Sequence, residues 1–218
     1  MYRRAHYMKV VEAAKAALSG ADVERKAAVC GFRAAGLAHA GHESVCAAYE
    51  VPFMGMTNYL LYPSLELERE GGGAASRVLQ CVVLHHLHHA REAALEGRYV
   101  SFAEIPGLAP YVPAVKRRVF DVLARAYGGA PVRLGEALAA VGGRAHGAGD
   151  ASGVVWLLPR VPAMVVIYGA DEEERAAASM LFDASVTEFL PLEDIVAAAE
   201  LAAHRLRYFA VKTGEGHG

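Results

Sequence analysis

Strand-like patterns occur in two separate groups in this chain, with helical patterns before, between and after them. The first group lies at 44–68, and the second is a pair of apolar runs at 153–168 that Pro159 and Pro162 divide. Strands do not alternate regularly with helices, as they would in a parallel sheet. The sequence therefore predicts an α+β fold in which an antiparallel meander and a hairpin pack with several helices.

Helical periodicity, capping residues and glycines give the expected element boundaries. Asp22 is placed as the N-cap of the second helix, and Gly97 as the end of a long central helix. Helices are expected at 5–18, 22–36, 74–96, 111–127, 133–141, 172–181, 185–190 and 191–208. Strands are expected within 44–53, 57–62, 65–68, 99–102 and 153–168. We expect 1–212 to form a single domain and 213–218 to be a flexible tail.

Composition excludes several classes of protein. The chain is 54% hydrophobic and 21% charged with a net charge of −2, which provides no field for nucleic acid or an anionic membrane. Its three cysteines are widely spaced, which argues against a zinc knuckle, an iron–sulfur site or a disulfide framework. No apolar run reaches the roughly 18 residues of a membrane span. We expect a cytoplasmic protein without nucleic-acid or membrane partners, and a homodimer is compatible with the sequence.

Four of the ten histidines lie within residues 85–89, inside one of the expected helices. Neutral imidazole is the commonest metal ligand in proteins. At 100° per residue the four span more than half the helix circumference, so they cannot all bind one ion. His86 falls on the most apolar stripe, His85 and His89 form an i, i+4 pair, and His88 is a bystander. The candidate metal ligands are His85, His86 and His89; the alternative is one buried His86 with solvated neighbours.

A single histidine on this helix is also a candidate axial ligand for haem or a corrinoid. Such a tetrapyrrole needs an apolar pocket, which the hairpin containing Tyr59 is expected to supply, and arginines that meet its propionates. The candidate residues for this cofactor are His86, Tyr59, Arg91 and Arg98. The same residues are also typical of an ordinary core and surface.

Two further classes of function stay open. Carboxylates around Asp171, Asp183 and Glu193 would suit a hydrolase or transferase, although their spacing is also typical of helix capping. The pair His39 and His42 could complete a metal site if its loop folded against the histidine helix. Cys46 and Cys81 could be nearby ligands, although small buried hydrophobic residues are the favoured interpretation. The remaining class is a structural or interaction protein without a small ligand.

Several short motifs occur in a characteristic order along the chain. They are Phe53–Tyr59, Tyr99–Gly107, Leu158–Pro162, Gly169–Glu173, Leu181–Asp183 and Leu190–Asp194. The ordered set resembles the uncharacterised family DUF3786 over about residues 45 to 205. This resemblance implies no activity, although members are similar to proteins of anaerobic bacteria and archaea, some linked with corrinoid-dependent one-carbon metabolism and some fused to iron–sulfur modules. The chain lacks such a cysteine-rich module, and His86, His88 and His89 depart from the family pattern.

Overall fold

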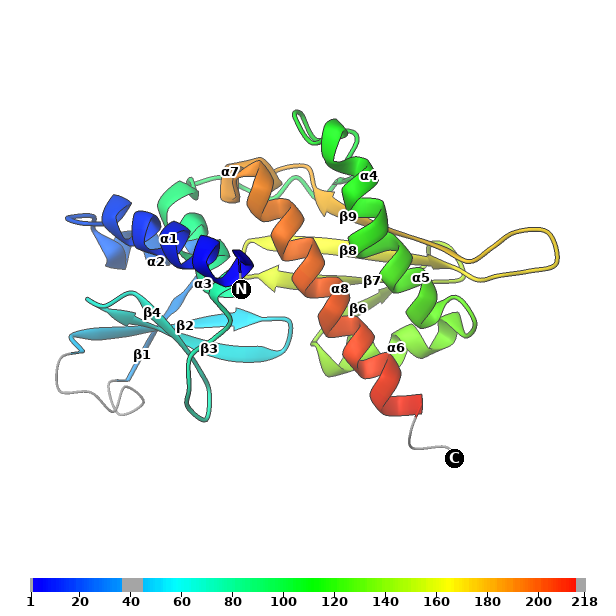
Figure 1. Ribbon diagram of the computed structural model, residues 1–218, viewed down its shortest axis with the longest axis horizontal. Helices are drawn as coiled ribbons and strands as arrows, with labels where there is room; N and C mark the ends of the chain where they lie inside the picture. Colours follow the sequence, from blue (N-terminus) through cyan, green and yellow to red (C-terminus); the bar gives the residue numbers. More distant parts are fainter. Residues whose placement is uncertain (1, 37–44, 215–218) are drawn as a thin grey trace.

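Two antiparallel sheets with helices between and around them form the molecule, as the α+β prediction requires (Figure 1). The computed structural model describes residues 2–36 and 45–214. The helices are α1 (Tyr2–Ala17), α2 (Val23–Cys30), α3 (Arg77–His89), α4 (Val112–Val115), α5 (Asp121–Tyr127), α6 (Leu134–Ala140), α7 (Val186–Phe189) and α8 (Leu192–Gly214). The strands are β1 (Arg33–Ala35), β2 (Ala47–Phe53), β3 (Met56–Tyr62), β4 (Glu66–Arg69), β5 (Tyr99–Val100), β6 (Arg144–His146), β7 (Ala151–Leu158), β8 (Val161–Tyr168) and β9 (Ala177–Asp183).

The first sheet has the order β1-β2-β3-β4 and contains the expected meander. Its central hairpin pairs Ala47 with Tyr62 at one end and Phe53 with Met56 at the other. Gly55 in the turn has a φ of +72°, and a Cβ there would lie 2.9 Å from the backbone of Val141. Glycine is therefore required both by the turn conformation and by the close approach of the α6 end.

Strand β1 was not expected, because the prediction of a helix at 22–36 is wrong in its second half. Asp22 does cap the helix, accepting a hydrogen bond from the Arg25 amide at 3.0 Å. The helix ends at Cys30, where Gly31 takes a left-handed conformation and its N–H closes the last turn. The chain then pairs with β2, and this tertiary pairing overrides the helical propensity of its alanines.

The second sheet has the order β5-β9-β8-β7-β6. The hairpin expected at 153–168 is confirmed as β7 and β8, with a register shift between Trp156 and Leu158 beside the proline-containing turn. The helix expected at 172–181 is wrong, since this stretch contains β9, which lies between β5 and β8. Pairing on both edges and burial of Met180 and Phe182 outweigh the helix propensity of the preceding alanines.

The central helix is shorter than the expected 74–96. Helix α3 begins after the N-cap Ser76 and ends at His89, with Ala90 already extended. Residues 91–96 are good helix formers, yet their backbone groups form hydrogen bonds with residues far away in the sequence. The Arg91 amide donates to the Glu188 carbonyl, and Arg160 donates to the Ala93 carbonyl. These tertiary hydrogen bonds replace the last two expected helical turns.

Helix α3 lies between the N-terminal helices α1 and α2 and the C-terminal helix α8. It contacts α1 and α2 on one side and α8 on the other, and α8 in turn packs on α5 and α6 (Figure 1). The expected helix at 111–127 is present as a helical run that includes a π-helical stretch, η3 (Lys116–Phe120). One large apolar cluster includes residues of both sheets, and this burial is the main stabilising term of the fold.

The end of the chain differs from the expected tail. Helix α8 continues to Gly214, so 213–214 are helical, and 215–218 lie outside the described residues. The proposed pair His39 and His42 also lies outside them. Among the described helices, none is both long enough and apolar enough to cross a membrane.

Candidate metal centre and adjoining cavity

Three potential metal ligands meet where α3 crosses the start of α8. The ligand atoms of Cys81, His85 and Asp194 all lie within 4.8 Å of one another. The His85 Nδ1 atom lies 2.6 Å from Asp194 Oδ2 and 3.7 Å from Cys81 Sγ. Cys81 and Asp194 are buried, whereas the His85 side chain is 30% exposed. The cluster is thus accessible from one side only.

Helical geometry explains how these side chains come together. Cys81 and His85 are four residues apart on α3, so they occupy adjacent turns of one face. Asp194 belongs to the first turn of α8, whose amides and dipole favour a carboxylate there. The packing of α8 against α3 brings Asp194 to His85 across 109 positions of sequence.

Two of the donor–donor distances can be compared with those of a tetrahedral metal site. Ordinary metal–sulfur and metal–nitrogen bond lengths place S and N about 3.5 Å apart, and N and O about 3.3 Å apart. The observed S···N separation of 3.7 Å is close to the first value. The N···O contact of 2.6 Å is a hydrogen bond, so Asp194 must withdraw by about 0.7 Å to admit an ion on these bond lengths. A side-chain rotation supplies a displacement of this size.

In the metal-free protein a proton occupies the position between His85 and Asp194. The hydrogen bond to Asp194, followed by that to Cys81, raises the pKa of His85 to about 10, while partial burial opposes the shift. His85 is therefore an imidazolium at neutral pH and donates to the carboxylate. A metal ion must displace this proton in order to bind.

This raised pKa predicts the pH dependence of stability of the protein kept in chelator. Because the folded pKa of about 10 exceeds the unfolded value of about 6.5, the pair's contribution is complete below pH 6.5 and is lost as the pH rises to 10. The free energy of unfolding, measured by urea denaturation, should fall between pH 7 and 10. Asp194→Asn should show a shallower fall, and equal slopes for the two proteins would contradict the assignment.

His86 lies in the core, as its apolar stripe predicts. It is 0% exposed, and its Nδ1–H donates to the Phe189 carbonyl at 2.9 Å. Burial lowers its pKa to about 4, against the opposing effect of its backbone hydrogen bonds, so the ring is neutral. Its Nε2 is buried and has no hydrogen-bond partner among the described residues. His86 is separate from the three-residue cluster.

The other two histidines of the run also differ in their surroundings. His89 donates from Nε2 to the Thr187 carbonyl at 2.9 Å, so His86 and His89 together attach the end of α3 to α7. His88 is exposed. Of the three histidines predicted as metal ligands, His85 alone lies beside further ligand atoms within 2–36 and 45–214.

The residues predicted for a tetrapyrrole are dispersed. Tyr59 packs with Ala48 and Leu61 in a small cluster apart from the main core. Arg91 pairs with Glu188 near the α3 end, and Arg98 pairs with Glu96. None of the four predicted residues lines the cavity described below: His86, Tyr59, Arg91 and Arg98.

Among the predicted carboxylates, Asp183 is buried and accepts hydrogen bonds that connect two segments of the chain. It is 2% exposed at the end of β9 and accepts hydrogen bonds from the amides of Glu96, Gly97 and Ser185 and from the Ser185 hydroxyl. Burial alone would raise its pKa, but these hydrogen bonds outweigh burial and lower it. Asp183 thus joins the segment after α3 to the start of α7.

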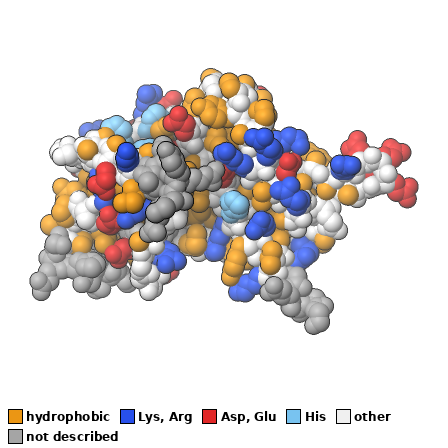
Figure 2. All heavy atoms as spheres, viewed as in Figure 1, with side chains coloured by type: hydrophobic (Ala, Val, Ile, Leu, Met, Phe, Trp, Pro, Cys, Tyr) orange, Lys and Arg blue, Asp and Glu red, His pale blue; other side chains and the backbone are white. Residues whose placement is uncertain are grey.

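Asp171 and Glu193 lie elsewhere. Asp171 accepts from the amides of Glu173 and Glu174 in an exposed turn, where helix capping was expected but no helix follows. This turn is in the projecting β8–β9 connection, whose tip carries acidic side chains (Figure 2). The length of β9, about 20 Å, separates that connection from Asp183. Glu193 instead lines a cavity on the α8 side.

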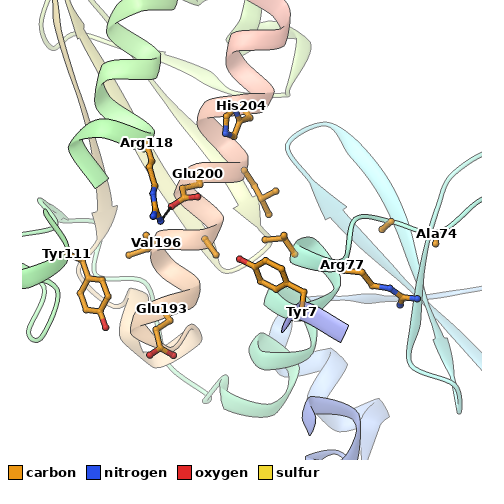
Figure 3. Close-up of a pocket in the computed structure, with 13 residues that line it drawn as sticks. Tyr7, Ala74, Arg77, Tyr111, Arg118, Glu193, Val196, Glu200 and His204 are labelled. Atoms are coloured by element: carbon orange, nitrogen blue, oxygen red, sulfur yellow. Dashed lines mark hydrogen bonds and ion pairs between the residues drawn. The ribbon is translucent and has the colours of Figure 1, made fainter. Parts of the chain in front are cut away.

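That cavity, of about 760 Å³, is lined by residues of α1, of the start of α3, of the 111–118 segment and of α8 (Figure 3). Val78 on α3 is one turn before Cys81, and Ala197 on α8 is one turn after Asp194. Tyr7 of α1 and Tyr111 line opposite sides of it (Figure 3). The candidate ligands and the cavity therefore occupy successive turns of the same two helices.

The fold and this cluster define an α+β protein with a candidate mixed-donor metal centre. The chain belongs to the family described as "Domain of unknown function (DUF3786)", whose model matches residues 32–205. This match confirms the resemblance seen in the sequence and begins earlier than the expected residue 45. No curated protein and no solved structure matches the chain.

Cys81 and Asp194 were not among the three histidines predicted to bind the metal. Cys81 was open as a nearby ligand but favoured as a small buried hydrophobic residue, and Asp194 belonged to the acidic residues attributed to helix capping. The i, i+4 spacing of Cys81 and His85 was a usable signal, because it places thiol and imidazole on one helical face. For Asp194 the sequence indicated only that it lies in the first turn of a helix. Its contact with His85 depends on how α8 packs.

Proposed function

We propose that this chain is a cytoplasmic metal-binding protein that holds one divalent transition-metal ion through Cys81 Sγ, His85 Nδ1 and an Asp194 oxygen. The observation that supports this proposal is the convergence of sulfur, nitrogen and oxygen donors within 4.8 Å at a half-enclosed position. A reducing compartment suits a site that depends on a free thiol.

The donor set favours zinc or cobalt over magnesium or calcium. Magnesium and calcium prefer oxygen ligands only, whereas a thiolate and an imidazole suit borderline metals. Three protein ligands leave a tetrahedral ion with a fourth position for water or another small ligand, as in catalytic zinc sites. Bound there, the ion would supply Lewis-acid chemistry.

The same three residues suit a cysteine nucleophile less well. In a nucleophilic triad, the carboxylate holds one imidazole nitrogen and the nucleophile approaches the other. Here Asp194 bonds to Nδ1, and Nδ1 is also the nitrogen nearer to Cys81 Sγ, at 3.7 Å against 4.0 Å for Nε2. The thiol is also largely shielded from substrate, since Cys81 is 3% exposed.

A tetrapyrrole cofactor is the weaker proposal for this helix. It would need a histidine with a free nitrogen facing a large apolar cavity. His86 has an unpartnered nitrogen but is enclosed by Phe32 and Phe189. Reconstitution with haem or a corrinoid tests this alternative through its absorbance, and we expect no stoichiometric complex.

The test of metal binding is a cobalt titration of the reduced protein. We expect saturation at one Co²⁺ per chain, with a near-ultraviolet thiolate-to-cobalt charge-transfer band and visible bands of a tetrahedral ion. Cys81→Ser should lose the charge-transfer band. Cys46→Ser, at an exposed cysteine, is the matched control and should retain it. Saturable binding without that band in the wild-type protein would contradict the ligand set.

Metal binding should also release a proton near pH 7 from the His85 imidazolium, because imidazole binds a metal ion in its neutral form. Calorimetric titrations with zinc in buffers of different ionisation enthalpy measure the number of protons released. Asp194→Asn should release about one proton fewer if it abolishes the raised pKa of His85. Release of no protons by the wild-type protein would exclude a site built on the imidazolium.

A further inference from the structure

The cavity beside the cluster has the size and lining of a binding site for a small molecule. Its volume of about 760 Å³ lies within the range of ligand pockets. Its wall on α8 extends from Glu193 to His204, about 16 Å of helix, so its mean cross-section is roughly 50 Å². This section admits an aromatic ring or an alkyl chain. Val78, Val196, Ala197 and Leu201 provide an apolar surface along this length.

The charges around the cavity disfavour an anionic ligand. Arg118 forms an ion pair with Glu200 at 3.0 Å (Figure 3). Arg77 forms one with Glu66 at 3.0 Å, and Lys15, which also contacts Glu66, has a second acidic partner in Glu12. Both lining arginines therefore already have acidic partners. Among the lining Arg, Glu and His side chains, only Glu193 and His204 have no ion-pair partner in the described part of the chain. Glu193 directly precedes Asp194, at the metal end.

The electrostatics of the proposed centre favour an uncharged ligand as well. A divalent ion with one thiolate, one carboxylate and one neutral imidazole carries no net charge. A further anion at its open position would give the centre a net negative charge, one residue from Glu193 in the sequence. A neutral nitrogen or carbonyl donor avoids this repulsion, and an N–H on the same group can donate to a carboxylate.

We propose that this cavity binds an uncharged organic molecule with an apolar body and an azole or amide head, and that the head occupies the open position of the metal ion. The proposal rests on the metal centre proposed above. Cys81, His85 and Asp194 do not themselves line the cavity; Val78 and Ala197, each one helical turn from a ligand residue, do. The proposal assigns the apolar body to the surface of Val78, Ala197 and Leu201, with the head directed past this end of the cavity toward Cys81 and Asp194.

The probe for this proposal is 4-phenylimidazole, titrated into cobalt-loaded protein while the visible bands are recorded. We expect a saturable spectral shift, and at least tenfold weaker binding of 4-phenylbutyrate, which has a similar apolar body and an anionic head.

Ala197→Phe, which fills the cavity, should weaken 4-phenylimidazole binding at least tenfold and leave cobalt affinity unchanged. Val78→Phe fills it from the facing helix and should do the same. Ala139→Phe, at an exposed position of α6, is the control.

The outcomes separate the two proposals. Cobalt binding with no spectral response to 4-phenylimidazole, or a response that both cavity-filling variants retain, overturns the ligand proposal alone. Tighter binding of 4-phenylbutyrate overturns the assignment of an uncharged ligand. If cobalt does not bind, the metal centre fails, and calorimetry with 4-phenylimidazole in chelator then tests the cavity. Binding sensitive to Ala197→Phe supports the cavity as a ligand site, and absence of binding overturns it.

Discussion

Replacing His85 by alanine should lower the affinity for Co²⁺ or Zn²⁺ by at least about 100-fold, since loss of an outer partner alone commonly costs 10–100-fold. His85 supplies the central nitrogen of the cluster, 3.7 Å from Cys81 Sγ and 2.6 Å from Asp194 Oδ2. Asp194→Ala should cause a loss of similar size. Competition against a chromophoric chelator measures each affinity.

The neighbouring histidines provide the controls for this experiment. His88 is exposed, and His89 donates to the Thr187 carbonyl, so His88→Ala and His89→Ala should change the affinity by less than about threefold, a difference of roughly 0.7 kcal/mol. A large loss in His89→Ala, with an unchanged His85→Ala, would instead support a site at the end of α3. Thermal unfolding of each metal-free variant checks that the fold is retained.

Replacing Asp183 by alanine should destabilise the protein by about 3 kcal/mol, because two buried donors of Ser185 and two partly buried amides would lose a charged acceptor. For a chain of this length the loss corresponds to a decrease in Tm of roughly 6–12 °C. The effect should appear in urea denaturation with chelator present, independently of any metal.

Asp171→Ala is the matched control for that substitution. Its carboxylate also accepts two backbone hydrogen bonds, but in an exposed turn where water replaces the lost acceptor. We expect a much smaller loss of stability than for Asp183→Ala. Equal effects of the two substitutions would contradict the structural role assigned to Asp183.

Local patterns predicted a large part of the fold. Asp22 caps α2 as expected, and the two apolar runs around Pro159 form the β7–β8 hairpin. The errors lie where tertiary contacts outweigh local propensity. Arg91 to Glu96 is a stretch of good helix formers, yet its backbone bonds to Glu188, Arg160 and Asp183 instead of forming helix.

The candidate site was predictable only in part. The histidine-rich helix was identified, and the burial of His86 followed from its apolar stripe. The spacing of Cys81 and His85 was enough to predict that they share a helical face. No local sequence pattern predicts that Asp194 lies next to them. That contact depends on the packing of two helices far apart in the sequence, and it distinguishes His85 from the histidines beside it.

X-ray absorption spectroscopy of the cobalt- or zinc-loaded protein tests the proposed centre most directly. The account predicts one sulfur neighbour at about 2.3 Å and two or three nitrogen or oxygen neighbours at about 2.0–2.2 Å, one of them an imidazole. The sulfur contribution should disappear in Cys81→Ser and persist in Cys46→Ser. A first shell without sulfur, or one made only of imidazoles, would contradict a centre built from Cys81, His85 and Asp194.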